Sequence, residues 1–280
     1  MKKVLSFDIG GTNTRLALIN ENYYIEKQLI YPTVCGSKEA FLESIKKIIL
    51  DLDIDMDEVS YIGAGVPGVV DKERGYIIDL PNVHIKDIPL GEFLEKEFGK
   101  KLAIRNDAEV ACLAEAVLGK GKKYNRVFFI TISTGLGGAL CVNKENQDYV
   151  TEIGHTLFRF HDGYYEYEGL ASGTGIVKLC NLYDYKIKKS SEFFEGVRNA
   201  DHDALMVYKD WLSILSDFIE MVQSSYEPDV ICVTGGVMKA KDIFFEDLCM
   251  LNPYSNIVEC HFSEGAGIMG AAIYAFKHVK

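Results

Sequence analysis

The sequence predicts an α/β protein built from two similar domains. Two Gly-rich turns carry this prediction, Asp8-Ile9-Gly10-Gly11-Thr12-Asn13-Thr14 near the start and Ser133-Thr134-Gly135-Leu136-Gly137-Gly138 in the middle. Each turn follows one apolar run and precedes another, which is the pattern of a strand, a tight turn and a second strand. We therefore expect a duplicated unit, with a ligand-binding cleft between the two copies.

The expected elements follow the apolar pattern of each half. In the first half, strands are expected at 4–7, 16–19, 24–30, 61–66 and 102–104, and helices at 41–49, 90–98 and 108–118. In the second half, strands are expected at 127–132, 139–142, 230–233 and 257–260, and helices at 177–182, 204–226 and 265–276. Gly99 and Gly119 follow two of the helices, where glycine commonly ends a helix. The predicted domains are residues 1–117, on which the C-terminal helix 266–280 packs back, and residues 118–265.

Composition limits the class of protein. The net charge of the 280 residues is −11, and the chain has no basic cluster beyond short pieces such as 120–123, so nucleic acid is not an expected partner. The seven cysteines include no C-x-x-C pair and several lie in apolar runs, which predicts reduced thiols. No apolar stretch approaches the length needed to cross a membrane. A soluble cytoplasmic protein is expected.

The two Gly-rich turns could bind phosphate. The tip of such a hairpin presents backbone N–H groups that can surround an anion. Asp8, at the end of the first strand, has two interpretations: a turn residue that satisfies local N–H groups, or a ligand that holds Mg²⁺ through water beside the phosphates. A pair of such turns favours a nucleotide-dependent phosphoryl-transfer enzyme.

Asn106 and Asp107 form the second candidate centre. Asn106 could simply cap the helix that starts here. Alternatively, Asp107 is kept ionised by the helix N-terminus and accepts the proton of a substrate hydroxyl that attacks phosphorus.

Glu152, His155 and Glu168 form the third centre. Two carboxylates and an imidazole in a turn-rich segment could bind the hydroxyls of a sugar, although a single His in a loop is more often structural. The nearby tyrosines 164, 165 and 167 could support that pocket or could be ordinary packing. Further along, Gly235, Gly236 and Gly265 allow close backbone approach, which would suit an adenosine.

The ordered motifs resemble the ROK family of sugar kinases and repressors, within the actin/hexokinase/Hsp70 fold group. Any one of these motifs is common, but the ordered set is specific and covers nearly the whole chain. Besides the two turns, the set comprises Gly65-Val66-Pro67-Gly68-Val69-Val70-Asp71, Pro81-Asn82, Asn106-Asp107-Ala108, Glu152-Ile153-Gly154-His155, Glu168-Gly169-Leu170-Ala171-Ser172-Gly173, Thr234-Gly235-Gly236 and Ala266-Gly267-Ile268-Met269-Gly270-Ala271-Ala272.

This resemblance implies a two-domain actin-like ATPase fold of duplicated ribonuclease H-like units, ATP and Mg²⁺ as co-reactants, a homodimer, and transfer of phosphate from ATP to the 6-hydroxyl of a hexose. It implies Asp107 as the catalytic base. The implied sugar-binding residues are Gly68, Asn82, Asn106, Asp107, Glu152, His155 and Glu168. The implied nucleotide-binding residues are Asp8, which would also hold Mg²⁺ through water, Gly10, Gly11, Thr12, Asn13, Ser133, Thr134, Gly135, Gly137, Gly235, Gly236 and Gly265.

One departure from the family concerns zinc. Many members hold a structural Zn²⁺ through the His of this motif and three closely spaced cysteines before the second Glu. The segment between His155 and Glu168 has no cysteine, and His155 with His161 supplies two of the roughly four ligands that a zinc site needs. We therefore predict no zinc. Members without zinc resemble bacterial N-acetylmannosamine kinases, so an N-acylhexosamine, with N-acetylmannosamine as the best guess, is the expected substrate. A second departure, Glu109 where the family often has Asn, has no consequence that the sequence assigns.

Three alternatives remain open. The same sugar-binding residues would serve a glucose, fructose or β-glucoside kinase. A sugar-sensing ROK repressor would carry an additional N-terminal DNA-binding region, which is not expected in an acidic chain that begins at its first strand. A chaperone or filament ATPase of the same fold group would lack the set of Glu152, His155 and Glu168.

Overall fold

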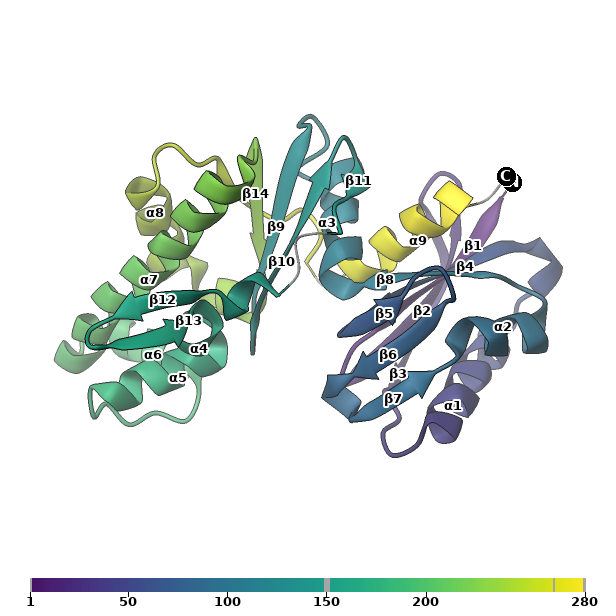
Figure 1. Cartoon of the computed structure of the whole chain (residues 1–280), viewed down its shortest axis with the longest axis horizontal. Coiled ribbons are helices and arrows are strands. Elements are labelled where there is room, and N and C mark those ends of the chain that lie inside the picture. The colour runs from purple at the N-terminus through teal and green to yellow at the C-terminus, as the bar shows by residue number, and fades with distance from the viewer. Residues whose placement is uncertain (1, 149–151, 264, 279–280) are drawn as a thin grey trace. The chain divides into compact units, whose positions relative to one another are not determined.

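The computed structural model describes residues 2–148, 152–263 and 265–278 (Figure 1). Contacts divide the chain into a first unit, residues 1–114 with 264–280, and a second unit, residues 115–263. Each unit is described by itself.

The first unit combines one large sheet, one small sheet and four helices among its described residues. Its strands are β1 (Lys3–Ile9), β2 (Asn13–Asn20), β3 (Ile25–Pro32), β4 (Val59–Val66), β5 (Val69–Asp71), β6 (Tyr76–Leu80), β7 (Ile85–Ile88) and β8 (Leu102–Asn106). Its helices are α1 (Lys38–Asp51), α2 (Leu90–Phe98), α3 (Asp107–Val117), which runs across the boundary into the second unit, and α9 (Ala266–His278).

The second unit has its own large sheet and a group of helices. Its strands are β9 (Arg126–Ile132), β10 (Leu136–Val142), β11 (Glu145–Asn146), β12 (Leu157–Phe160), β13 (Gly163–Glu166), β14 (Val230–Thr234) and β15 (Ile257–Glu259). Its helices are α4 (Tyr167–Ala171), α5 (Gly173–Leu182), α6 (Ser190–Arg198), α7 (His202–Tyr226) and α8 (Lys241–Leu251).

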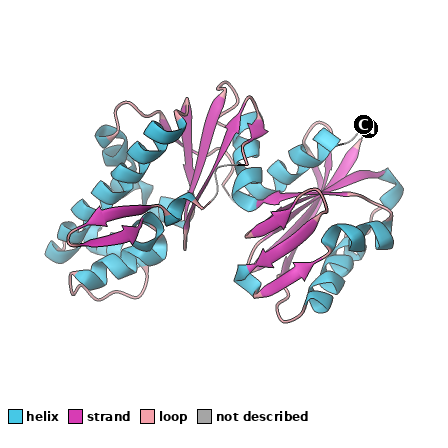
Figure 2. Ribbon diagram, in the orientation of Figure 1, coloured by secondary structure: helices cyan, strands magenta, loops and turns pink. Residues whose placement is uncertain are grey.

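The large sheets of the two units have the same topology. The strand order is β3-β2-β1-β4-β8 in the first unit and β11-β10-β9-β14-β15 in the second. In each sheet the first two strands pair antiparallel, whereas the later strands pair parallel to the first one. Figure 2 draws the strands of each sheet as magenta arrows. The predicted α/β fold with a duplicated unit is confirmed.

Alternating side chains of β1 divide the first unit into two layers. Leu5, Phe7 and Ile9 face the core that contains α1 and α2, whereas Val4 faces α9. This alternation is the two-residue period of a strand. Ser6, on the same face as Val4, donates its hydroxyl to the carbonyl of Ile268 at 2.5 Å, which joins α9 to the sheet. Figure 1 shows α9 on one face of this sheet and α1 and α2 on the other.

The core of the second unit gathers aromatic side chains around Trp211. This residue of α7 is fully buried, and its indole N–H donates to the carbonyl of Ala171 at 3.1 Å. The rings of Phe193, Phe194 and Phe244 contact it with centroids 5.0 to 6.1 Å away. Edge-to-face packing of this kind stabilises a core beyond the area that it buries.

Several elements differ from the prediction. The segment 157–166, expected to be turn-rich, is the β12–β13 hairpin, and helices α6 and α8 were not predicted. The segment 69–88 forms a separate sheet of order β5-β6-β7. The strands of these two small sheets have five residues or fewer, so a sequence period has few residues over which to appear.

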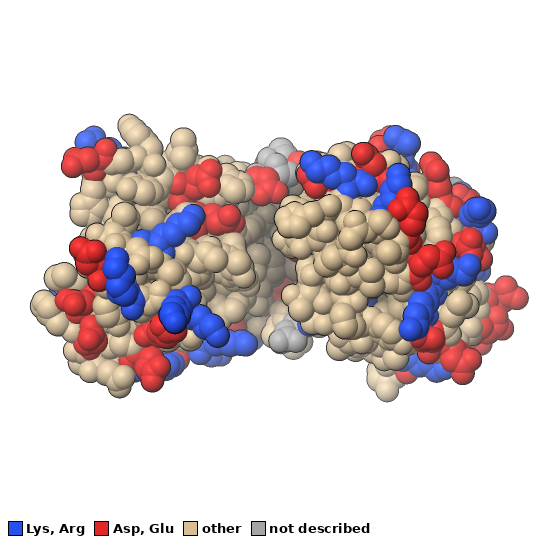
Figure 3. Space-filling view, turned by 90° about the horizontal axis from the view of Figure 1, so that it is seen from below, with Lys and Arg blue, Asp and Glu red and all other residues tan. Residues whose placement is uncertain are grey.

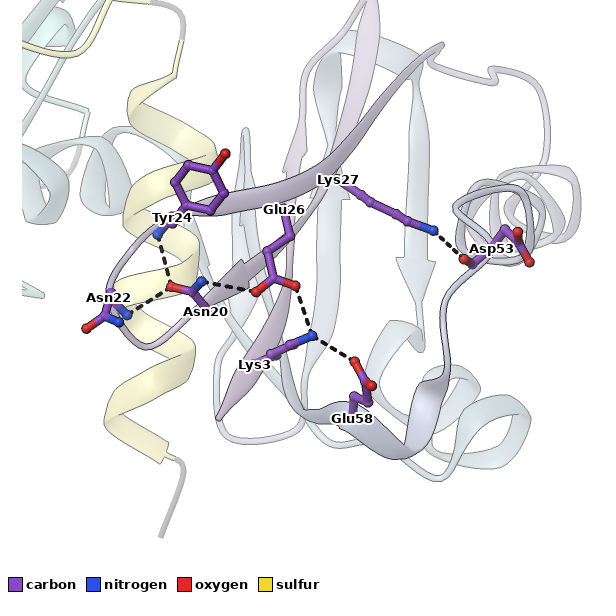
Figure 4. A network of polar contacts seen from close by, with 8 residues as sticks. All are labelled: Lys3, Asn20, Asn22, Tyr24, Glu26, Lys27, Asp53 and Glu58. Carbon is purple, nitrogen blue, oxygen red and sulfur yellow. Dashed lines mark hydrogen bonds and ion pairs between the residues drawn. The ribbon is translucent and has the colours of Figure 1, made fainter. Parts of the chain in front are cut away.

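The surface of the first unit carries local ion pairs. Lys3 lies between Glu26 and Glu58, at 2.9 and 2.8 Å, and Asn20 donates to Glu26 at 3.0 Å (Figure 4). On the face displayed in Figure 3, lysine and arginine side chains lie among carboxylates and form no continuous basic surface. Within the described residues, no helix has both the length and the apolar character needed to cross a membrane.

Candidate functional site

The first Gly-rich turn presents two backbone N–H groups. The amide of Gly10 donates to the carbonyl of Asn13 at 2.9 Å, which closes the turn between β1 and β2. Thr33 stabilises the turn through two hydrogen bonds. Its hydroxyl donates to the carbonyl of Gly10 at 2.7 Å, and its amide donates to the carbonyl of Thr12 at 2.9 Å. The amides of Gly11 and Thr12 have no acceptor within the described part of the chain. Such an arrangement can bind a phosphate oxygen.

Asp8 is paired with an arginine that the sequence analysis did not single out. Its carboxylate lies 3.2 Å from the guanidinium of Arg15, which is its cross-strand neighbour on β2. Burial raises the pKa of Asp8, and the charge of Arg15 opposes that rise. A Cβ on Gly267, in the first turn of α9, would lie 2.5 Å from an oxygen of Asp8. Only glycine leaves that oxygen uncovered from the side of α9.

Asn106 and Asp107 lie where β8 ends and α3 begins. Asn106 makes two bonds: its side-chain oxygen accepts from the amide of Ala108 at 2.9 Å, and its side-chain NH₂ donates to the carbonyl of Gly68 at 3.2 Å. The carboxylate of Asp107 also accepts from the amide of Ala108, at 2.8 Å. Asn106 therefore caps α3, as one interpretation held, and also joins this helix start to Gly68.

Gly68 occupies a position that needs glycine. Its φ is +91°, and a Cβ there would lie 2.3 Å from the carbonyl oxygen of Asp79. Asn82, which lies on the short 3₁₀ turn 81–83, is exposed and lies against Gly11, where an added Cβ would meet the Cβ of Asn82 at 2.7 Å. Asn82 thus lies beside the first Gly-rich turn, in the same unit as Asn106 and Asp107.

The second Gly-rich turn is held by the segment that follows α4. The amide of Ser133 donates to the carbonyl of Gly135 at 2.8 Å, and the amide of Gly173 donates to the carbonyl of Ser133 at 2.7 Å. The hydroxyl of Thr174 donates to the carbonyl of Thr134 at 2.7 Å. The amides of Thr134 and Gly135 have no acceptor among the described residues, as in the first turn.

The third glycine segment adjoins this turn. The amide of Gly236 donates to the hydroxyl of Ser133 at 3.0 Å. Gly235 has a φ of +110°, and a Cβ there would lie 2.3 Å from the carbonyl oxygen of Ile132. Gly137 has an ordinary strand position in β10. Gly265 lies at the start of α9 in the first unit, next to Glu264, which is outside the described residues.

Glu168 contacts the second turn directly. One of its carboxylate oxygens accepts from the amide of Leu136 at 2.8 Å and lies where a Cβ on Gly135 would reach it at 2.5 Å. A residue predicted to bind sugar therefore contacts the turn predicted to bind phosphate. Glu168 and this turn both belong to the second unit.

Glu152 and His155 lie on the exposed side of the same unit. Glu152 has a left-handed backbone, with φ of +52°, and its side chain is 68% exposed. The Nδ1 atom of His155 lies 3.0 Å from the carboxylate of Glu166, and its Nε2 atom lies 3.6 Å from that of Glu152. The bond to Glu166 raises the pKa of His155, and the charges of Glu168 and Glu152 add to that rise.

Aromatic packing orders the segment between His155 and Glu168. The rings of Phe158 and Tyr167 stack with centroids 4.4 Å apart, and Tyr167 also contacts Phe218 of α7 at 5.2 Å. Tyr165 contacts Phe160 at 6.1 Å, whereas Tyr164 is exposed. In the described ranges, no three His, Cys, Asp or Glu side chains are grouped to hold a metal ion. The absence of zinc stays a prediction.

Sequence reasoning missed Arg15, Glu166 and Thr174 as parts of these centres. Arg15 could have been found by counting outward from the turn between β1 and β2, since it pairs with Asp8 in the antiparallel register. The contact of Glu166 with His155 depends on the β12–β13 hairpin, and the contact of Thr174 with Thr134 depends on the fold of the second unit. Glu109, which had no assigned consequence, forms an ion pair with Arg105 at 3.2 Å.

Two units of the same topology, each opening with a Gly-rich hairpin, define the duplicated fold of the actin-like ATPases. Solved structures agree with this class. A ROK hexokinase from Thermus thermophilus is 22% identical with a TM-score of 0.82, and the match covers 99% of both chains. A Listeria monocytogenes protein, proposed to be an N-acetylmannosamine kinase, is 21% identical with a TM-score of 0.87, covering 99% of this chain and 100% of that one.

The family follows from the sequence comparison. A model of the ROK family matches residues 4–278, so the chain belongs to the ROK family. A glucokinase from Thermotoga maritima is 27% identical to this chain, and the match covers 96% of each protein. An N-acetylgalactosamine kinase from a Shewanella species is 26% identical over 254 residues, 84% of this chain and 82% of that protein.

Proposed function

We propose that this chain is an ATP-dependent sugar kinase that phosphorylates the 6-hydroxyl of a hexose or N-acylhexosamine. The reaction class is supported by relatives that are named as sugar kinases and that match 96% and 84% of the chain. The observation that carries the proposal is the Asp107 carboxylate at the start of α3, joined through Asn106 to Gly68 in a unit that also has a Gly-rich turn with bare amides.

The two turns are proposed to bind the phosphates of ATP. Gly11 and Thr12 in one turn, and Thr134 and Gly135 in the other, offer amides that need an acceptor. Such preorganised donors stabilise the charge that develops on the phosphoryl oxygens, and they need no rearrangement during the reaction. We further propose that Gly235 and Gly236 lie near the nucleoside, since Gly236 is bonded to Ser133 of the second turn.

Asp107 is proposed to act as the general base. Its carboxylate would accept the proton of the sugar 6-hydroxyl while that oxygen attacks the γ-phosphorus of ATP, and ADP would leave with the bridging oxygen. The amide of Ala108 donates to the carboxylate of Asp107 and so fixes the orientation of that carboxylate. Alignment and charge neutralisation supply most of the acceleration in phosphoryl transfer, and the base contributes less.

Mg²⁺ fits the donor set of the first turn. Asp8 supplies one carboxylate, and Mg²⁺ in such enzymes commonly uses one or two carboxylates with phosphate oxygens and water. The oxygen that Gly267 leaves uncovered is the one we propose to hold Mg²⁺ through water, while the other oxygen pairs with Arg15. When bound, the ion would neutralise negative charge on the phosphates.

The residues that we propose for sugar binding are polar groups and one glycine, named here for each unit by itself. In the first unit these are Gly68, Asn82 and Asn106. In the second they are Glu152, His155 and Glu168. We favour an N-acylhexosamine, specifically N-acetylmannosamine, because an aromatic hairpin without cysteine lies between His155 and Glu168, where the resemblance would place a zinc loop. Glucose, fructose and β-glucosides are the alternatives. We also propose a cytoplasmic homodimer, in keeping with the seven free cysteines and with the family.

The substitution Asp107→Asn tests the assignment of the base. It keeps the size of the side chain and an oxygen for the amide of Ala108, so sugar binding measured by calorimetry should change little, whereas turnover should fall at least about a hundredfold. Glu92→Gln is a matched control, because Glu92 lies exposed in the first turn of α2 in the same unit and should leave turnover unchanged. Near-normal turnover in Asp107→Asn would show that another group takes the proton.

A further inference from the structure

The imidazole of His155 lies between two carboxylates. Its Nδ1 atom is within hydrogen-bond distance of Glu166, at 3.0 Å, whereas its Nε2 atom is 3.6 Å from Glu152, too far for a hydrogen bond. The His155 side chain is half exposed, so the ring is partly open to solvent. One ring nitrogen is therefore already engaged, and the other is available.

The hairpin fixes the position of Glu166. Glu166 is the last residue of β13 and pairs with Leu157 of β12, two residues after His155. The next residue, Tyr167, is buried, stacks on Phe158 and donates its amide to the carbonyl of Thr156 at 3.1 Å. Because both sides of this short loop are anchored, the backbone of Glu166 is held beside that of His155.

We propose that Glu166 is a positioning residue: it accepts the Nδ1 proton of His155 and thereby turns the lone pair of Nε2 toward a hydroxyl hydrogen of the sugar. The inference rests on the proposed sugar kinase function. A carboxylate in this place selects one tautomer and one ring orientation, which is the role that outer carboxylates have behind histidines in many sites.

The charges around the ring set the pH dependence. Glu166 of β13, Glu168 of α4 and Glu152 before the 3₁₀ turn 153–155 all raise the pKa of His155, and Glu166 has the largest effect. Strand β10, which also packs against this turn, carries no charged side chain. An Nε2 lone pair exists only in the neutral ring, so sugar binding should improve as pH rises through the raised pKa of His155. Removing the charge of Glu166 lowers that pKa and moves the improvement to lower pH.

Two variants separate the charge of Glu166 from its hydrogen bond. Glu166→Gln keeps an oxygen that can accept from Nδ1, so the acidic limb of kcat/KM for sugar should move to lower pH with little change at high pH. Glu166→Ala removes the acceptor, so KM for sugar should rise about tenfold or more at all pH values while KM for ATP stays unchanged. Asp162→Asn, at the exposed tip of the same hairpin, is the control for loss of charge and should leave both parameters as they are.

The tautomer itself can be observed without any activity. In ¹⁵N spectra of the full chain, with His155 assigned by its loss in His155→Asn, the neutral ring should carry its proton on Nδ1. Glu166→Ala should convert this signal to a mixture of tautomers, and Asp162→Asn should not.

The outcomes distinguish the two proposals. If the wild-type protein phosphorylates no sugar, the proposed function fails, and the spectra still decide whether Glu166 sets the tautomer. If the wild-type protein is active but Glu166→Ala leaves the sugar KM, the pH profile and the His155 tautomer unchanged, Glu166 has no positioning role. A proton found on Nε2 in the wild-type protein also overturns the inference.

Discussion

The carboxylate of Glu115 makes hydrogen bonds to both the beginning and the end of the second unit. It is the first residue of that unit, lies near the end of α3 and is fully buried. One carboxylate oxygen accepts from the amide of Lys120 at 2.9 Å, and the other accepts from the amide of Phe262 at 2.7 Å, one residue before the unit ends. A single buried carboxylate thus joins the two segments through which the chain enters and leaves the unit.

Removing this carboxylate should strongly destabilise the second unit. Hydrogen bonds to a charged group contribute about 1.5–3 kcal/mol each, and an amide left without an acceptor when buried costs about 1–3 kcal/mol. Glu115→Ala should therefore lower the free energy of unfolding by about 3–5 kcal/mol, which corresponds to a fall in Tm of roughly 6–20 °C. Glu115→Gln should cost less, about 1.5–3 kcal/mol, because its amide oxygen still accepts one bond whereas its NH₂ faces a donor.

The measurement is urea unfolding followed by the fluorescence of Trp211, the one tryptophan of the chain, which reports on the second unit. The matched control is Glu246→Gln on α8, an exposed position that should change the free energy of unfolding by less than about 0.5 kcal/mol. Should Glu115→Ala and Glu115→Gln unfold at the same urea concentration as this control, the carboxylate does not hold the two segments together.

Two further outcomes are expected. Phe244→Ala should lower the free energy of unfolding by about 3–5 kcal/mol and shift the Trp211 emission to the red, since Phe244 is fully buried with its ring centroid 5.0 Å from that of Trp211; an unchanged urea midpoint would contradict this. Burial raises the pKa of the Cys180 thiol to about 12, so a thiol reagent at pH 8 should modify exposed Cys35 first and leave Cys180 unreacted until unfolding, which peptide mapping would check. Because that folded-state pKa exceeds the ordinary thiol value, the same group should also lower stability as pH rises toward 12.

Elements with a clear local signal were predictable. The helix at 90–98 has the limits that the sequence predicted, since Gly99 takes the left-handed conformation that ends it, with φ of +65°. The two Gly-rich hairpins and the parallel strands after them were also found, because each strand is a continuous apolar run. The duplication of the α/β unit was predicted because a Gly-rich turn between two apolar runs occurs twice in the sequence.

The β12–β13 hairpin shows what was missed and why. The pair Asp162-Gly163 is common in hairpin turns, but the aromatic side chains around it were interpreted as a loop. In the structure the two-residue turn is His161-Asp162, and Gly163 begins β13. The bond between Glu166 and His155 depends on this hairpin, so it could not be anticipated once the hairpin was missed. The pairing of Asp8 with Arg15, in contrast, needed only the register of a hairpin that had been predicted.

Contacts between segments far apart in the sequence could not be predicted from the sequence. Glu115 and Phe262 are separated by 147 positions, and their bond exists only because the start and end of the second unit meet. The same holds for Glu168 and Leu136, 32 positions apart, where a carboxylate from α4 contacts the second Gly-rich turn. In both cases the residue types gave no local pattern, since a buried glutamate and an exposed one look alike in a sequence.

The most direct test of the proposed sugar kinase function is a panel of sugars with ATP and Mg²⁺, followed by ADP release and by ³¹P NMR of the product. Glucose, mannose, fructose, N-acetylglucosamine and N-acetylmannosamine form the panel, and we expect fastest turnover with N-acetylmannosamine and a phosphate on its 6-oxygen. Faster turnover with another of these sugars would correct the substrate but keep the reaction. No sugar-dependent ADP release with any of them, or a phosphate on a different oxygen, would contradict the proposed function.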